Sequence, residues 1–173
     1  MNWFGVMPAM TTPFKTDYAV DHELLTRHSE WLLDNGCHGL VMLGSLGEGA
    51  TLEHDEKVAI LGSALKAAAP RNKPVVAAIS ALSTKNAVIL AKEAEQAGCS
   101  GLMVLPPYVY ASDWREMKEH VAKVIGATKL PCMLYNNPIA YTTDFTPTQV
   151  AELASEFENL KAVSQPLLLR LIS

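Results

Sequence analysis

The sequence of 173 residues lacks the features that mark secreted and membrane-embedded proteins. It has only three cysteines, Cys37, Cys99 and Cys132, which are far apart and form no CxxC pair. This usage excludes a disulfide framework and indicates small buried thiols in a reducing compartment. Apolar runs are far shorter than the ~18 residues of a membrane span, and residues 1–20 lack the basic and apolar order of a secretory signal. We therefore expect a cytoplasmic protein without a membrane partner.

Charge of either sign is also sparse. Lys and Arg number 14 against 18 Asp and Glu, for a net charge of -4. The basic residues form no cluster that could follow a phosphate backbone, so nucleic acid is not an expected partner. The five histidines do not fall at metal-ligand spacings. No motif therefore indicates a metal or an organic cofactor, and the composition is that of a globular domain.

What the sequence does contain is an alternation of apolar and helical segments. Each short apolar run is followed by turn residues and then by a stretch with helical periodicity. We expect strands in the apolar runs at 4–10, 39–43, 74–79, 101–105, 131–135 and 160–163. We expect helices at 22–34, 53–69, 84–97, 113–126 and 146–156. Runs that are apolar on both faces are typical of parallel strands covered by helices.

Residues that favour helix ends stand at the expected boundaries. Asp21 precedes the first predicted helix, and Gly36 follows it, where a left-handed cap is needed. Thr51 begins the second predicted helix, with acidic residues in its first turns. In the last predicted helix, Thr146 takes the cap position and Pro147 takes the first helical position. These signals support the alternating pattern independently of hydrophobicity.

About five and a half βα units in succession predict a parallel α/β fold, for which two architectures remain open. A doubly wound sheet can be complete with five or six strands, whereas a (β/α)8 barrel needs eight strands and about 250 residues. No GxGxxG or GxxxxGK[ST] motif follows the first strand, which counts against a nucleotide-binding doubly wound sheet. In both architectures, ligands bind at the carboxyl ends of the strands.

Three segments that follow strands carry candidate binding residues. They are GSLGEGATL (44–52), PPYVYASDW (106–114) and YNNPIAY (135–141). Gly44, Ser45 and Gly47 offer backbone N–H groups beside a helix N-terminus, which suits a carboxylate. The Tyr135 hydroxyl can relay a proton to a bound substrate. Each feature also has a structural explanation, in a tight turn or a packed aromatic ring, but their common position at one rim favours a site.

The segments GSLGEGATL, YNNP and MPAMTTPF resemble motifs of the dihydrodipicolinate synthase / N-acetylneuraminate lyase family, in the same order and spacing. The resemblance covers residues 3–163. It implies a (β/α)8 barrel, of which this chain would hold about five and a half units. It also implies a class I aldolase-like lyase, in which a lysine forms a Schiff base with a small 2-oxo acid. Full-length relatives are commonly homotetramers, which implies a homo-oligomer.

The resemblance further implies roles for individual residues. Tyr135 would be the catalytic proton donor and acceptor, while Asn136 and Asn137 would brace the turn after it. The loop after the second strand, with its main chain, would hold the substrate carboxylate. Its substrate-binding residues would be Gly44, Ser45 and Leu46.

Departures from the family pattern bear on the substrate. Leu46 stands where dihydrodipicolinate synthases have a second loop threonine, and Val109 stands at their second loop tyrosine. Ala140 replaces the arginine that would pair with a dicarboxylic substrate. The motifs LGSLGE, VLPP and YNNPIAYTTDFTP are closer to the branch that acts on 1-pyrroline-4-hydroxy-2-carboxylate. We therefore expect a deaminase of that cyclic imine, with 4-hydroxy-tetrahydrodipicolinate synthase as the alternative.

Ser164, in NLKAVSQ (159–165), occupies the position of the family's Schiff-base lysine. Lys161 lies three residues earlier, and strand alternation would turn it to the opposite face. Because serine cannot form an imine, the chain as given is expected to lack the covalent step. We therefore divide it into 1–163, the N-terminal part of a barrel domain, and 164–173, an aberrant tail. A truncated, non-catalytic fragment is a second hypothesis, and a barrel completed by another chain is a third.

Overall fold

The computed structural model describes residues 1–107 and 113–165. At its centre is a five-stranded parallel sheet in the order β1-β2-β3-β4-β5, so that each strand pairs with its predecessor in the chain. The strands are β1 (Leu40–Met42), β2 (Val75–Ile79), β3 (Gly101–Val104), β4 (Cys132–Tyr135) and β5 (Leu160–Ser164). The helices are α1 (His22–Asp34), α2 (His54–Ala68), α3 (Thr84–Ala97), α4 (Trp114–Ile125), α5 (Pro138–Tyr141) and α6 (Pro147–Glu156), with short 3-10 turns η1 (Ser45–Gly47) and η2 (Ala69–Arg71).

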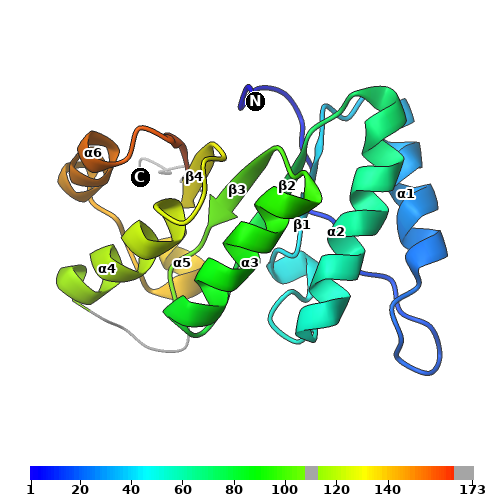
Figure 1. The fold of residues 1–173 in the computed structure, drawn as a ribbon, viewed down its shortest axis with the longest axis horizontal. Coiled ribbons are helices and arrows are strands. Elements are labelled where there is room, and N and C mark those ends of the chain that lie inside the picture. Colours follow the sequence, from blue (N-terminus) through cyan, green and yellow to red (C-terminus); the bar gives the residue numbers. More distant parts are fainter. Residues whose placement is uncertain (108–112, 166–173) are drawn as a thin grey trace, which may run out of the picture.

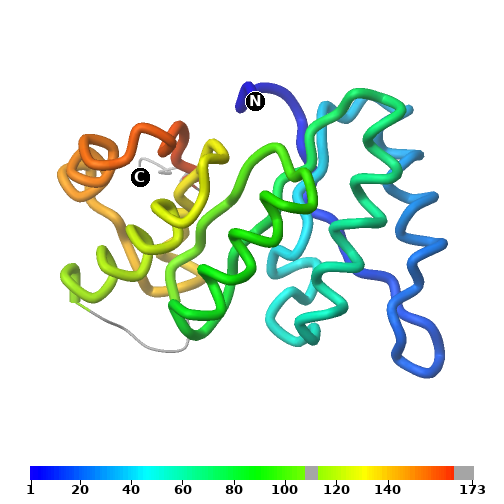
Figure 2. The backbone as a smooth tube through the Cα atoms, in the orientation of Figure 1, coloured from blue at the N-terminus to red at the C-terminus, as the bar shows by residue number. Residues whose placement is uncertain are grey.

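The longer helices stand in a row in chain order, from α1 through α2 and α3 to α4 and α6 (Figure 1). From α1 onward, the colours in Figure 2 follow one another from one end of this row to the other. A doubly wound sheet would instead reverse its strand order at a switch point. The sequential order therefore decides between the two predicted architectures in favour of a segment of barrel wall.

Alternate residues of the strands divide between two apolar layers, as in a barrel wall. The helix-facing layer contains the apolar residues of α1, α2, α3, α4 and α6 together with one set of strand residues. Those strand residues are Leu40, Met42, Val75, Ala77, Ile79, Leu102, Val104, Cys132, Leu134 and Leu160. The interior layer, on the opposite face, consists of Val41, Val76, Ala78, Met103 and Leu105, packed with Trp3, Met7, Met133, Tyr135 and Tyr141. The fold is thus α/β, an incomplete (β/α)8 barrel, as predicted.

The first predicted strand, residues 4–10, is irregular. Ala9 forms an isolated parallel bridge with Val41. The Val41 N–H donates to the Pro8 carbonyl and the Met10 N–H donates to the Val41 carbonyl, both at 2.9 Å. Pro8 has no N–H to contribute, so a regular ladder cannot form. The segment nevertheless lies beside β1, in the position of the first strand of a barrel.

Helix boundaries follow the capping residues. The Asp21 carboxylate accepts a hydrogen bond from the Leu24 N–H at 2.9 Å, and α1 begins at the next residue, as predicted. α2 (His54–Ala68) lies within the predicted range 53–69, but Thr51, which was expected to begin the helix, does not cap it. Glu53 caps α2 instead, in a reciprocal capping box in which the Glu53 N–H donates to the Glu56 carboxylate at 2.8 Å.

One asparagine fixes the start of β5 against β4. The Asn159 side-chain amide donates to the carbonyls of Ile125, Thr128 and Leu130 at 3.1–3.2 Å. The Asn159 carbonyl in turn accepts from the Cys132 N–H at 2.7 Å. The fifth strand is therefore held both by its ladder and by the loop that precedes β4.

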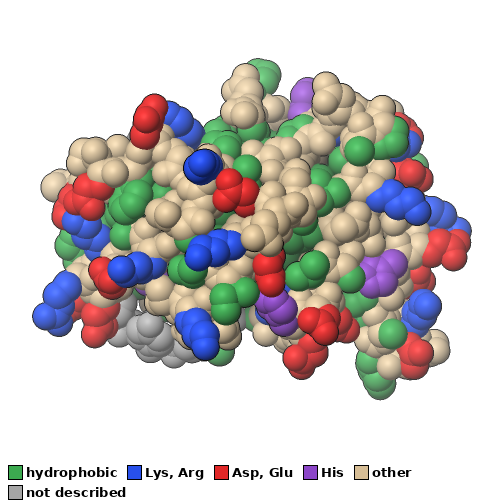
Figure 3. All heavy atoms as spheres, in the orientation of Figure 1, with side chains coloured by type: hydrophobic (Ala, Val, Ile, Leu, Met, Phe, Trp, Pro, Cys, Tyr) green, Lys and Arg blue, Asp and Glu red, His purple; other side chains and the backbone are tan. Residues whose placement is uncertain are grey.

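On the face of the molecule in Figure 3, acidic and basic side chains are interspersed over the surface. No helix within 1–107 or 113–165 is long and apolar enough to cross a membrane.

Candidate active site

The carboxyl end of β4 carries the predicted catalytic tyrosine. Tyr135 is the last residue of the strand and belongs to the interior layer. Its ring meets the ring of Tyr141 edge to face, with centroids 5.8 Å apart and an interplanar angle of 71°. This geometry is the favourable one for aromatic pairs and limits the positions that the phenol can take.

Asn136 locks the turn that follows. It is buried, and its side-chain nitrogen donates to the Asp144 carboxylate at 3.0 Å and to the Phe145 carbonyl at 3.2 Å. Its side-chain oxygen accepts from the Phe145 N–H at 3.0 Å. The bracing role expected for Asn136 is thus confirmed, because its whole amide is used to hold residues 144–145 behind the strand end.

Asn137 connects the strand end to the short helix α5. Its side-chain oxygen accepts from the Ala140 N–H at 3.2 Å and caps α5. Its side-chain nitrogen donates to the Tyr135 hydroxyl oxygen at 3.0 Å. Helix α5 was not among the predicted helices, although Asn137 followed by Pro138 is a helix-start signal. The contact between Asn137 and the phenol was not predicted either.

Ser164 lies beside Tyr135 on the neighbouring strand. The two residues are partners in the β4–β5 register, and the Asn136 N–H donates to the Ser164 carbonyl at 2.9 Å. Residues in register on adjacent strands project to the same face of a sheet. The half-buried Ser164 therefore shares the interior face with the tyrosine.

Lys161 lies at a shift of register, where simple strand alternation does not hold. The register shifts between Cys132, which pairs with Leu160, and Met133, which pairs with Ala162, so Lys161 has no partner in the ladder. Such a bulge interrupts the simple in-and-out alternation on which the prediction relied. Lys161 is nonetheless exposed, at the opposite end of β5 from the residue that faces Tyr135.

The predicted carboxylate loop forms the turn η1 after β1. The Gly47 N–H donates to the Gly44 carbonyl at 3.0 Å, so it cannot serve a ligand as the sequence analysis suggested. Across the described residues, the N–H groups of Gly44, Ser45 and Leu46 have no hydrogen-bond acceptor. Successive backbone N–H donors without acceptors form a site that can bind an anion. The side chains of Ser45 and Leu46 are exposed.

The backbone of this loop is held in one conformation by close contacts. Leu43 has a φ of 65°, a left-handed conformation that costs a residue with a side chain about 1–3 kcal/mol. Gly49 packs on it, because a Cβ at Gly49 would lie 2.0 Å from the Leu43 carbonyl oxygen. The buried Thr12 hydroxyl donates to the Gly47 carbonyl at 2.7 Å. The loop is therefore shaped before any ligand binds.

The loop and the tyrosine border the same interior layer. A Cβ built on Gly44 would lie 3.9 Å from the Met103 methyl group. Met103 is the register partner of Met133, which precedes Tyr135 by two residues on the same face. The structure thus brings Tyr135 next to Ser164. The turn η1 is connected to this pair through Met103 and Met133. The predicted loop residues Tyr108, Val109 and Tyr110 lie outside the described residues.

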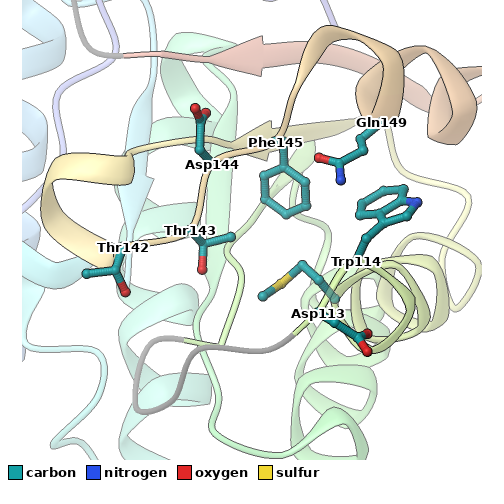
Figure 4. Close-up of a pocket in the computed structure, with 8 residues that line it drawn as sticks. Asp113, Trp114, Thr142, Thr143, Asp144, Phe145 and Gln149 are labelled. Atoms are coloured by element: carbon teal, nitrogen blue, oxygen red, sulfur yellow. The ribbon is translucent and has the colours of Figure 1, made fainter.

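A separate cavity of about 150 Å³ lies behind the end of β4 (Figure 4). It is lined by the first turn of α4 and by the segment from Thr142 to Gln149. Trp114 and Phe145 meet in it edge to face, with centroids 6.2 Å apart. Both residues belong to the helix-facing side of the sheet. This cavity is therefore distinct from the interior rim that carries Tyr135.

The cysteines are not placed for catalysis. Cys99 and Cys132 are buried, and burial raises the pKa of each thiol to about 12. Cys37 is half-buried, so the expectation of three buried thiols is correct for two. Among the residues that the structure describes, no cluster of His, Cys, Asp and Glu could hold a metal ion.

Comparison with known proteins connects this geometry to a family. The family model described as Dihydrodipicolinate synthetase family matches residues 2–167. A 4-hydroxy-tetrahydrodipicolinate synthase of Chelativorans sp. (strain BNC1) is 35% identical over 159 residues, covering 92% of this chain and 54% of the relative. The chain spans about half the length of the curated relatives it matches.

Solved structures agree. The prophage protein YagE of E. coli K12, a member of the dihydrodipicolinic acid synthase family crystallised with pyruvate, superposes with a TM-score of 0.89 at 29% identity, covering 94% of this chain and 54% of YagE. A catalytic lysine mutant of the Ruminococcus gnavus sialic acid aldolase has a TM-score of 0.89 at 20% identity, covering 95% of this chain and 53% of the aldolase, and supports the fold alone. The resemblance stated from the motifs is confirmed.

Proposed function

Because this chain belongs to the dihydrodipicolinate synthetase family, we propose that it provides the carboxylate-binding and proton-transfer part of a Schiff-base lyase for a small 2-oxo acid. The observation that carries the proposal is the pairing of Tyr135 with position 164 on the interior face. In such a lyase, an amine attacks the ketone carbon and water leaves, so protons must move between the nitrogen and the departing oxygen. A phenol at the rim is suited to that transfer.

The loop after β1 would hold the substrate carboxylate. The N–H groups of Gly44, Ser45 and Leu46, which have no acceptor in the part of the chain that the structure describes, present partial positive charge at the start of a helical turn. A carboxylate that accepts two or more of them would fix the 2-oxo acid with its ketone directed along the interior layer. The preformed backbone at Leu43 and Gly49 supports this, since no reorganisation is needed on binding.

Ser164 determines what this chain can do by itself. Its register with Tyr135 supports the correspondence to the lysine position, but an imine needs a primary amine, which serine lacks. We therefore propose that the chain as given binds a 2-oxo acid without forming the covalent intermediate. The division into 1–163 and a tail at 164–173 belongs to the same proposal, as do a cytoplasmic location and a homo-oligomeric full-length form.

The reaction of the corresponding enzyme would be deamination of 1-pyrroline-4-hydroxy-2-carboxylate. The exposed Ala140 supports this choice, because an apolar side chain cannot pair with the second carboxylate of a dicarboxylic substrate. The alternative is 4-hydroxy-tetrahydrodipicolinate synthesis, which is favoured by the names of relatives such as the Chelativorans synthase. Parallel assays with the cyclic imine, and with pyruvate plus aspartate semialdehyde, discriminate the two reactions in any form of the protein that carries the amine.

Borohydride trapping tests the site itself. With pyruvate, the native chain should give no adduct, whereas the Ser164→Lys variant should gain one reduced pyruvate unit that peptide mapping assigns to position 164. Ser164→Arg is the matched control, because it brings the same charge without an amine that forms an imine. An adduct on Lys161 of the native chain, or none on folded Ser164→Lys protein, would refute the proposed site.

A further inference from the structure

We infer that Asn137 is a positioning residue for Tyr135, orienting the phenol and stabilising the negative charge that develops on it during proton transfer. The inference rests on the proposed function for its role in the reaction. The hydrogen bond from the Asn137 side-chain nitrogen to the Tyr135 hydroxyl oxygen, at 3.0 Å, carries it.

The orientation of the Asn137 amide is determined by its other end. Its oxygen accepts from the Ala140 N–H at 3.2 Å, and an N–H can only donate. The amide nitrogen must therefore face the phenol, so the side-chain amide cannot be turned around without losing the cap of α5. A single residue thus couples the start of α5 to the position of the tyrosine hydroxyl.

The contact leaves the phenol proton free for other use. A phenol has one hydrogen to donate, and here its oxygen already accepts from Asn137. The hydroxyl hydrogen is therefore directed away from Asn137. When that proton is transferred, the donated N–H stabilises the oxygen anion that remains.

Among residues 1–107 and 113–165, no other polar side chain forms a hydrogen bond with the Tyr135 hydroxyl. The loop position where the resemblance implied a threonine is Leu46, which has no polar side-chain atom. The edge-to-face contact with Tyr141 is made by the ring and positions it. Asn137, two residues along the chain, supplies the polar partner from the same strand end.

The competing explanation is that Asn137 serves only as the cap of α5. Two substitutions distinguish this structural role from the proposed positioning role. Asn137→Ser keeps a cap oxygen but is too short to reach the phenol. Asn137→Asp keeps the cap and the size but replaces the donor by a negative oxygen. If Asn137 only caps α5, both variants should leave Tyr135 unchanged.

The measurement is the nitration rate of Tyr135 by tetranitromethane, a reagent that attacks the phenolate, followed by peptide mass mapping across a pH series. Asn137→Ser should slow nitration of Tyr135 about fivefold, the effect of one lost net hydrogen bond. Asn137→Asp should slow it further. Tyr18, which is 85% exposed, is the internal reference and should not change. An equal or faster rate for Tyr135 in Asn137→Ser overturns the inference.

A second measurement does not depend on altering Asn137. In the native chain, the side-chain amide protons of Asn137 should give one downfield-shifted resonance, which returns toward the usual position in Tyr135→Phe. A resonance that does not respond to Tyr135→Phe overturns the inference even if the nitration variants fail to fold.

The role in the reaction is tested in the Ser164→Lys background. Addition of Asn137→Ser should slow pyruvate trapping at position 164 about fivefold without changing the pyruvate concentration for half-saturation. Equal trapping rates would overturn the positioning role. If Ser164→Lys is not trapped at all, the proposed function fails, whereas the nitration ratio still decides whether Asn137 acts on the phenol.

Discussion

Asn136→Ala should be the most damaging single change at the strand end. The side chain is 2% exposed and makes three hydrogen bonds, at 3.0, 3.2 and 3.0 Å, to Asp144 and to both backbone groups of Phe145. Phe145 is itself 2% exposed, so its N–H and carbonyl cannot turn to solvent when the amide is removed. The turn that carries α5 would then lose its anchor.

The magnitude follows from the number of groups left unpaired. A buried backbone group without a partner costs about 1–3 kcal/mol, and the lost bond to the exposed Asp144 costs at least about 0.5–1.5 kcal/mol. Two unpaired groups and one lost bond therefore give a decrease of about 2.5–7.5 kcal/mol in the free energy of unfolding. This is a large part of the about 5–15 kcal/mol that stabilises a typical domain.

Urea denaturation followed by circular dichroism measures the effect, with Asn137→Ala as the matched control. Asn137 is half-buried, and its cap is expected to be worth about 1 kcal/mol. The denaturation slope should remain constant in both variants. A loss below about 1.5 kcal/mol for Asn136→Ala, or equal losses in the two variants, would show that the amide is not the anchor that the geometry indicates.

Three further predictions concern the loop, the pH dependence and the thiols. Gly49→Ala places a Cβ 2.0 Å from the Leu43 carbonyl oxygen, so we expect the free energy of unfolding, measured by calorimetry, to fall by about 1–3 kcal/mol. Pyruvate binding, measured by titration, should also weaken. Native values for both quantities would contradict this close packing. Burial lowers the pKa of His120, so its imidazole stays neutral when the unfolded chain takes up a proton below about pH 6.5. The free energy of unfolding should therefore decrease as the pH falls through that range, by at most about 1.4 kcal/mol per pH unit from this group, and His120→Gln should flatten the decrease in urea titrations at several pH values. Cys99 and Cys132, whose pKa values are raised to about 12, should resist a disulfide reagent at pH 8 until urea unfolds the chain; rapid modification of the folded chain would refute their burial.

The helices could be predicted closely because their ends carry local chemical signals. α1 and α3 begin and end at the predicted residues, with Asp21 as one cap and Gly98 in the left-handed conformation as another. At α2, two acidic residues, Glu53 and Glu56, cap each other, so the helix begins at His54, within the predicted range 53–69, and Thr51 is not its cap. Thr51 was favoured because threonine is a more common helix N-cap than glutamate.

The strands were less predictable because their regularity depends on partners. Residues 4–10 were expected as a strand, but Pro8 reduces the pairing to an isolated bridge. The shift of register at Lys161 likewise depends on β4, which lies about 30 residues away in the chain. Alternation along one strand cannot reveal a bulge that the neighbouring strand imposes.

At the candidate site, the sequence indicated which residues gather but not how their hydrogen bonds are shared. Gly47 appeared to be a free donor, yet its N–H closes the turn on Gly44. Asn137 appeared only to brace the turn, yet its nitrogen reaches the Tyr135 hydroxyl. Both outcomes depend on backbone angles within a few residues, which residue type alone does not fix.

The sequential strand order has a consequence for how this protein is made. Every strand from β2 onward finds its pairing partner in the segment synthesised immediately before it. Each new unit can therefore dock on a finished neighbour as it leaves the ribosome, without waiting for distant parts of the chain. Growth of the sheet in one direction would leave each newly added strand edge unpaired only until the next unit docks on it.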